Sequence, residues 1–218
     1  CFLDGEFDPP PSPPISQWCL CPGHLRMLRA LLKQTKMFIM SDVSIFNVVN
    51  ILGAIFVLGG YAVALTRFPD YRAALWGGVT GVTQNFFTLS MLLATAGYLV
   101  FFFVVLLKSN PNETNGDAVR LLTVLCLIFL FASAIWMPAT IAYIDKHQIF
   151  AWILAVSSLW VTAAALISLT VMFAVSDMGI ESSRLKTLAV TGLIYITFHC
   201  LVLDAIIWVC RFPVRQPD

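Results

Sequence analysis

Five long apolar runs, separated by short polar segments, dominate the pattern of the chain. They cover residues 44–66, 84–107, 119–144, 149–175 and 187–209. Each run exceeds the ~20 residues that a helix needs to cross the hydrocarbon core of a bilayer. The runs are apolar nearly all round, unlike the one-sided stripe of a helix in a soluble protein, and they lack the strict alternation of membrane β-barrel strands. The pattern therefore predicts an all-α, polytopic transmembrane bundle of five helices.

The segments between the runs differ in length. Only residues 145–148 separate the third run from the fourth, so these two helices are expected to form an antiparallel hairpin. Residues 67–83 make the longest connection, where the aromatic residues Tyr71 and Trp76 are typical of a membrane interface. We expect the transmembrane domain to cover residues 41–212, with a C-terminal tail at 213–218.

The first 40 residues have a different pattern. Residues 1–23 are rich in proline, which lacks a backbone donor, so we expect a disordered tail there. Residues 24–40 predict an amphipathic helix that lies in the headgroup plane of an anionic leaflet. The residues that form its basic, membrane-binding face are Arg26, Arg29, Lys33 and Lys36. The alternative is that this segment is the solvated start of the first span.

Composition agrees with a lipid environment. Of the 218 residues, 59% are hydrophobic and 11% are charged, whereas a soluble domain carries about 25% charged residues. The lipid bilayer is therefore the expected partner, together with other membrane proteins or a second copy of the chain. The formal net charge of +1 does not indicate a nucleic-acid partner.

Basic residues predict which way the bundle faces, because cytoplasmic loops are enriched in Lys and Arg. Eight lie on the N-terminal side and five on the other: Arg26, Arg29, Lys33, Lys36, Lys108, Arg120, Arg184 and Lys186 against Arg67, Arg72, Lys146, Arg211 and Arg215. The N-terminus is thus expected on the cytoplasmic side of a membrane whose identity stays open. Asn112 begins a glycosylation sequon on the same side, and a glycan there would reverse this orientation.

Ionisable residues inside a span are costly and are therefore candidates for function. Asp204 is the only carboxylate well inside an apolar run, and His199 lies near the middle of the same run. On an α-helix, five residues correspond to a rotation of about 140°, so these two are expected not to pair. Tyr195 and Thr191 share a stripe with His199. The stripe and Asp204 either line a proton or substrate path or form hydrogen bonds between helices, and we favour the second interpretation.

Other polar or irregular positions have two interpretations each. Asn47 and Asn50, three residues apart in the first run, either coordinate a ligand or hold helices together. Pro138 is expected to kink the third helix, because proline cannot donate a hydrogen bond to a carbonyl one turn earlier. Cys19, Cys21 and His24 are spaced like metal ligands, but zinc needs four ligands, so no zinc site is predicted. Lipid attachment at Cys19 or Cys21 is the alternative.

No sequence motif of a hydrolase, a metalloprotease or a phosphate-binding loop occurs, so no catalytic residue, metal or cofactor is predicted. The leading hypothesis is a scaffold or accessory component of the membrane without catalytic activity. The alternative is a small transporter or channel for protons or a small solute that uses Asp204 and His199. A lipid-modifying enzyme that uses His199 ranks third.

Overall fold

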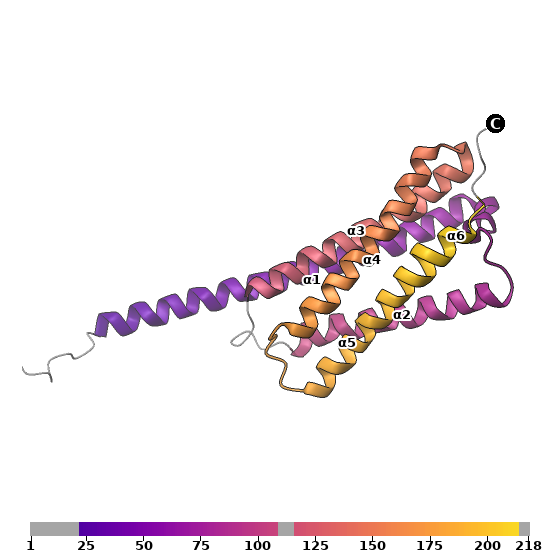
Figure 1. Cartoon of the computed structure of the whole chain (residues 1–218). Coiled ribbons are helices and arrows are strands. Elements are labelled where there is room, and N and C mark those ends of the chain that lie inside the picture. Colours follow the sequence, from indigo (N-terminus) through magenta and orange to yellow (C-terminus); the bar gives the residue numbers. More distant parts are fainter. Residues whose placement is uncertain (1–21, 109–115, 214–218) are drawn as a thin grey trace, which may run out of the picture. The chain divides into compact units, whose positions relative to one another are not determined.

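The computed structural model describes residues 22–108 and 116–213, with side chains for residues 42–108 and 116–213 (Figure 1). Its long helices are α1 (Pro22–Arg67), α2 (Val82–Lys108), α3 (Gly116–Lys146), α4 (Ile149–Val175) and α5 (Ser183–Phe198). The last of these continues into a π-helix, η4 (His199–Trp208), and a final turn, α6 (Val209–Arg211). No strand occurs in these residues.

Five helices are long and apolar enough to cross a membrane. The candidate spans are Asp42–Arg67, Val82–Lys108, Gly116–Lys146, Ile149–Val175 and Ser183–Arg211. Many of their largest apolar side chains face outward: Phe56 is 71% exposed, Phe131 66% and Phe150 73%. Water would make such a surface unstable, whereas lipid solvates it. The predicted all-α bundle of five spans is confirmed, and the chain is built as a multi-pass integral membrane protein.

The chain divides into two compact units, Cys1–Met37 and Phe38–Asp218. Residues 24–40 belong to α1, and their place at a membrane surface stays a prediction. The side chains of the predicted basic face (Arg26, Arg29, Lys33 and Lys36) lie outside the described part. So do the tail at 1–21, including Cys19 and Cys21, the sequon at Asn112 and residues 214–218. All residues with described side chains belong to the second unit.

The helices of the second unit pack mainly as two neighbouring pairs, α3 with α4 and α2 with α5. The turn between α3 and α4 is so short that His147 adopts a φ of +51°, in the left-handed region. Where α2 crosses α5, a Cβ placed on Gly192 would lie 2.5 Å from the carbonyl oxygen of Gly97. Such a close approach of two backbones needs glycine on both helices.

Aromatic side chains fill the bundle toward the end at which the first span begins and α2 and α4 end. Phe101 of α2 packs edge-on against Phe173 of α4, with ring centroids 5.0 Å apart, and Phe46 of α1 lies 6.1 Å from Phe101. All three are fully buried. Edge-on aromatic pairs fill space well and add to the stability that burial supplies.

The connection at 67–83 folds over the end of the last span. It contains two short helices, η2 (Pro69–Tyr71) and η3 (Ala74–Trp76). The indole of Trp208 donates a hydrogen bond to the carbonyl of Leu75 at 3.0 Å, and the backbone N–H of Gly78 donates to the carbonyl of Arg211 at 3.1 Å. These bonds fix the C-terminal end of the last span relative to the loop.

Two sequence predictions concern single residues of these elements. Tyr71 donates a hydrogen bond to Asp145 Oδ1 at 2.8 Å, and Trp76 is half-buried against an apolar cluster that includes Val79 and Trp208. Their place at a membrane interface stays a prediction. Helix α3 continues past Pro138 to Lys146, so the proline does not end the helix, and the predicted kink is not tested.

Candidate functional site in the last span

An irregular stretch of backbone lies in the last membrane span. Residues His199–Trp208 form ten residues of π-helix between the α-helical segments α5 and α6. In a π-helix the hydrogen bonds join residues five apart rather than four, and most such segments are single turns that occur frequently at functional sites. The segment reads HCLVLDAIIW and contains neither glycine nor proline, so its composition does not signal the irregularity.

This backbone brings together the two ionisable residues of the span. His199 Nε2 lies 3.6 Å from Asp204 Oδ2. The expectation that the two residues cannot pair is therefore wrong, because it assumed α-helical geometry throughout. Five residues correspond to a rotation of about 140° on an α-helix, but residues i and i+5 lie on one face of a π-helix.

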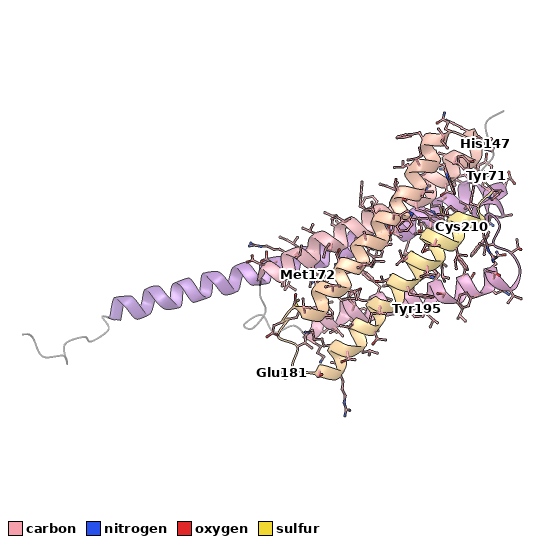
Figure 2. The ribbon with its side chains drawn as sticks, in the orientation of Figure 1. Tyr71, His147, Met172, Glu181, Tyr195 and Cys210 are labelled. Carbon is pink, nitrogen blue, oxygen red and sulfur yellow. The ribbon has the colours of Figure 1, made fainter. Side chains whose placement is uncertain are left out.

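A neighbouring helix holds the imidazole in place. Ser90 of α2 has its Oγ 2.9 Å from His199 Nδ1. The hydroxyl of Tyr195, a residue of α5 that is labelled in Figure 2, donates to the same oxygen at 3.1 Å. Ser90 is 1% exposed and His199 6%. We call Tyr195, Ser90, His199 and Asp204 the His199 cluster. It connects α2 to the last span through a chain of polar groups within the bundle.

Each ring nitrogen of His199 faces one polar group. Nδ1 faces Ser90 Oγ, and Nε2 faces the Asp204 carboxylate. A serine oxygen has two lone pairs, so it can accept from the Tyr195 hydroxyl and also either accept from His199 Nδ1 or donate to it. The geometry is therefore compatible with both neutral tautomers of the imidazole.

The two ends of the His199 cluster differ in exposure to the surroundings. The His199 side chain is 7% exposed, but that of Asp204 is 30% exposed. The cluster thus has a buried end at His199 and a partly exposed end at Asp204.

The remaining residues that the sequence singled out do not join this cluster. Thr191 is exposed, and its hydroxyl donates to the carbonyl of Thr187 in its own helix at 2.9 Å. The predicted stripe therefore contributes only Tyr195 and His199. Asn47 Oδ1 is buried and accepts no hydrogen bond from the described residues.

Asn50 belongs to a second polar cluster, between α1, α2 and α3. Its Nδ2 donates to the carbonyl of Phe46 at 2.7 Å, and its Oδ1 accepts a short hydrogen bond from Tyr98. The thiol of Cys126 is fully buried beside Asn50 and Tyr98. We call Asn50, Tyr98 and Cys126 the Asn50 cluster. Its neutral groups satisfy one another, which agrees with the interpretation of Asn50 as a link between helices.

Sequence reasoning missed Ser90, which holds the imidazole. A single serine in an apolar run gives no distinct signal, because most such hydroxyls bond to their own helix. Thr88 and Thr95 of the same span do so, donating to the carbonyls of Gln84 and Met91. No group of three or more His, Cys, Asp or Glu side chains that could hold a metal occurs among the described residues.

Comparisons with known proteins do not assign the chain to a group: no family model, no curated protein and no solved structure matches it. A functional proposal therefore depends on the geometry of the chain itself.

Proposed function

We propose that the protein is a small transporter or channel that carries protons or a small solute across the membrane, with Asp204 and His199 at its binding station. The observation that supports this proposal is the close approach of His199 Nε2 and Asp204 Oδ2, 3.6 Å apart, within a membrane span. Ionisable groups at such a depth are costly to bury and typically belong to proton or substrate paths.

The surroundings of the pair favour transport over a purely structural bond. A structural pair is best kept in a closed, regular helix, whereas this pair uses an irregular backbone and leaves the Asp204 side chain 30% exposed. A carboxylate that is partly open on one side and linked to an imidazole on the other can accept a cation or proton and pass it on.

A second candidate, the scaffold or accessory role, has its own support in α1. Only 11% of the most apolar stretch of this span is buried inside the bundle. Large side chains along this span, among them Ile55, Phe56 and Leu58, are at least 61% exposed. Another membrane protein or a second copy of the chain could pack against this face. No contact among the described residues favours the third hypothesis, a lipid-modifying enzyme.

Flux measurements on the purified chain in proteoliposomes test the transport proposal. We expect Asp204→Asn and His199→Ala to lower flux roughly tenfold or more, because each removes one half of the pair. Asp70→Asn is a matched control, because it neutralises an exposed carboxylate of the connecting loop. Transport is excluded if the parent moves neither protons nor any tested solute. The role of Asp204 is excluded if Asp204→Asn retains full flux.

The orientation also stays a proposal, with the N-terminus on the cytoplasmic side as the distribution of basic residues predicts. Treatment of the expressed protein with an endoglycosidase tests it. A mobility shift that disappears in Asn112→Gln would place this loop on the lumenal side and reverse the orientation.

A further inference from the structure

The His199 cluster lies at the depth where a membrane span is farthest from water. The last candidate span is Ser183–Arg211, so Thr197, 14 residues from each end, marks its middle. Tyr195 and Asp204 lie on either side of this middle, and their separation of nine residues corresponds to ~13 Å along a helix, nearly half of the ~30 Å hydrocarbon core. The cluster therefore places polar groups across the part of the bilayer in which water supplies none.

Successive groups of the cluster are in contact and leave no passage between them for a molecule. The Tyr195 hydroxyl lies 3.1 Å from Ser90 Oγ, and this oxygen lies 2.9 Å from His199 Nδ1. Both Ser90 and His199 are buried. A solute or a hydrated ion that crossed here would have to separate α2 from the last span. A proton needs no such opening, because it moves along hydrogen bonds.

Every group between the two ends can accept a proton and release one. The hydroxyl of Ser90 carries one hydrogen and two lone pairs, and the imidazole of His199 turns one nitrogen to Ser90 and the other to Asp204. A proton that arrives at one ring nitrogen while another leaves from the second nitrogen converts one neutral tautomer into the other. Both tautomers fit the geometry, so the site accommodates the imidazole before and after such a transfer.

We propose that the transported species is the proton, and that it crosses the middle of the bilayer along Tyr195, Ser90, His199 and Asp204. This inference rests on the proposed transport function and names its substrate. It makes Ser90 and Tyr195 proton carriers, with Tyr195 at the end of the path opposite Asp204. The Tyr195 side chain is half-buried and that of Asp204 is 30% exposed, so both ends are more accessible than the two groups between them.

One passage returns each inner group to its neutral form. The phenol of Tyr195 gives its proton to Ser90 Oγ as this hydroxyl gives its own proton to His199 Nδ1. The bond between His199 Nε2 and its hydrogen breaks, and this proton joins the Asp204 carboxylate. The tyrosine oxygen takes a replacement proton from its own side, and Asp204 releases one on the other side. No charge stays on Ser90 or His199, where burial would make it costly, and rotation of the imidazole and the hydroxyls resets the path.

The contact between His199 and Asp204 is where this path opens and closes. Nε2 and Oδ2 are 3.6 Å apart, which exceeds the length of an N–H···O hydrogen bond, about 2.7–3.2 Å, by several tenths of an ångström. Because the Asp204 side chain is partly exposed, its carboxylate has room to turn toward the imidazole. The π-helix places both groups on one face, so a small rotation is enough to complete the path.

Proton flux into proteoliposomes that enclose a pH-sensitive dye tests this path. A potassium gradient with valinomycin supplies the driving voltage, and parallel vesicles with a sodium-sensitive dye measure sodium flux. We expect the parent chain to acidify the vesicle interior and to carry no sodium. Proton flux should fall in D₂O by more than the higher viscosity explains, because every transfer breaks a bond to hydrogen. These measurements need no variant, so they test the proposal even where a variant does not fold.

Variants test the two carriers that the proposal adds. Tyr195→Phe and Ser90→Ala should each lower proton flux several-fold without abolishing it, because a water molecule replaces the lost hydroxyl only in part. The double variant should lose no more flux than the more impaired single variant, since both hydroxyls belong to one path. Thr191→Val is the matched control. It removes a hydroxyl one turn earlier in α5 that donates to the carbonyl of Thr187, and it should leave flux unchanged.

The outcomes distinguish this inference from the proposed function. Proton flux that depends on Asp204 but is unchanged in Tyr195→Phe and Ser90→Ala leaves transport in place and overturns the path through the two hydroxyls. Flux of sodium instead of protons also leaves transport in place and overturns the substrate. Proton flux without an isotope effect overturns transfer along fixed groups. Absence of flux of every tested species overturns the proposed function itself.

Discussion

Two polar clusters lie within the same apolar bundle, and they meet the cost of burial in different ways. The Asn50 cluster consists of neutral groups on regular α-helices, which hydrogen-bond to one another and to the carbonyl of Phe46. The His199 cluster pairs an imidazole with a carboxylate, uses a π-helix to do so and leaves Asp204 partly open. The first arrangement is what packing requires. The second is more costly than packing needs, and this excess is why we place function there.

Two substitutions, one in each cluster, give the strongest test of this comparison, because we expect them to have opposite effects on stability and flux. Asn50→Leu removes the amide and leaves the Tyr98 hydroxyl unpaired, so we expect the free energy of unfolding to fall by about 1 kcal/mol while flux stays near that of the parent. Asp204→Asn should do the reverse and abolish flux with little loss of stability. Thermal unfolding in detergent and proteoliposome flux measure the two effects. A folded Asn50→Leu variant without flux would contradict the division of roles.

A change in helix spacing tests whether the His199 cluster depends on the neighbouring helix. In Gly192→Leu the new side chain meets the backbone of Gly97 and separates α5 from α2, which carries Ser90. We expect unfolding to become easier by about 1–3 kcal/mol, as for other overpacked sites, and flux to fall. Gly60→Leu is the control, because a Cβ there meets nothing within 4 Å. Equal stability of the two variants would show that the crossing at Gly97 is not tight.

Removing the hydroxyl that holds the imidazole should have a smaller effect. Ser90→Ala leaves His199 Nδ1 without its partner, so we expect a loss of about 1 kcal/mol in unfolding free energy and partly reduced flux. Thr88→Ala, two residues earlier, removes a hydroxyl that bonds only to its own helix and should change neither quantity. Unchanged flux in Ser90→Ala would show that the imidazole is positioned without Ser90.

The smallest effect is expected outside the spans, at Tyr71. Its hydrogen bond to Asp145 raises the pKa of the Tyr71 phenol above its usual value, because the carboxylate favours the protonated form. A raised pKa stabilises the fold below the usual pKa of tyrosine, and this contribution is lost as the pH rises through the folded value. Ultraviolet titration of the parent against Tyr71→Phe should therefore assign the Tyr71 phenol a pKa above that of free tyrosine. Asp145→Asn should lower this value, with flux unchanged. A Tyr71 phenol that titrates like free tyrosine in the parent would refute the hydrogen bond.

Much of the architecture follows from the sequence alone. Long runs without charged residues are poorly solvated by water and therefore partition into lipid. Because lipid offers no hydrogen-bond partners, the backbone there must satisfy its own hydrogen bonds, so the runs form membrane-spanning helices. Only four residues separate the third and fourth runs, which leaves a hairpin as the solution. Polarity alone also singled out His199, Asp204 and Asn50, because a costly residue in an apolar run is conspicuous whatever it contacts.

Tertiary structure decided how those residues are arranged. The rotation of Asp204 around the last span depends on contacts from segments far away in the chain: Ser90 holds His199 at the start of η4, and the carbonyl of Leu75 holds Trp208 at its end. The backbone between these two contacts is π-helical, although its ten residues contain no glycine or proline. The local sequence determines the number of residues per helical turn only where contacts with distant segments do not override it. In this span such contacts place a carboxylate and an imidazole on the same face of the helix.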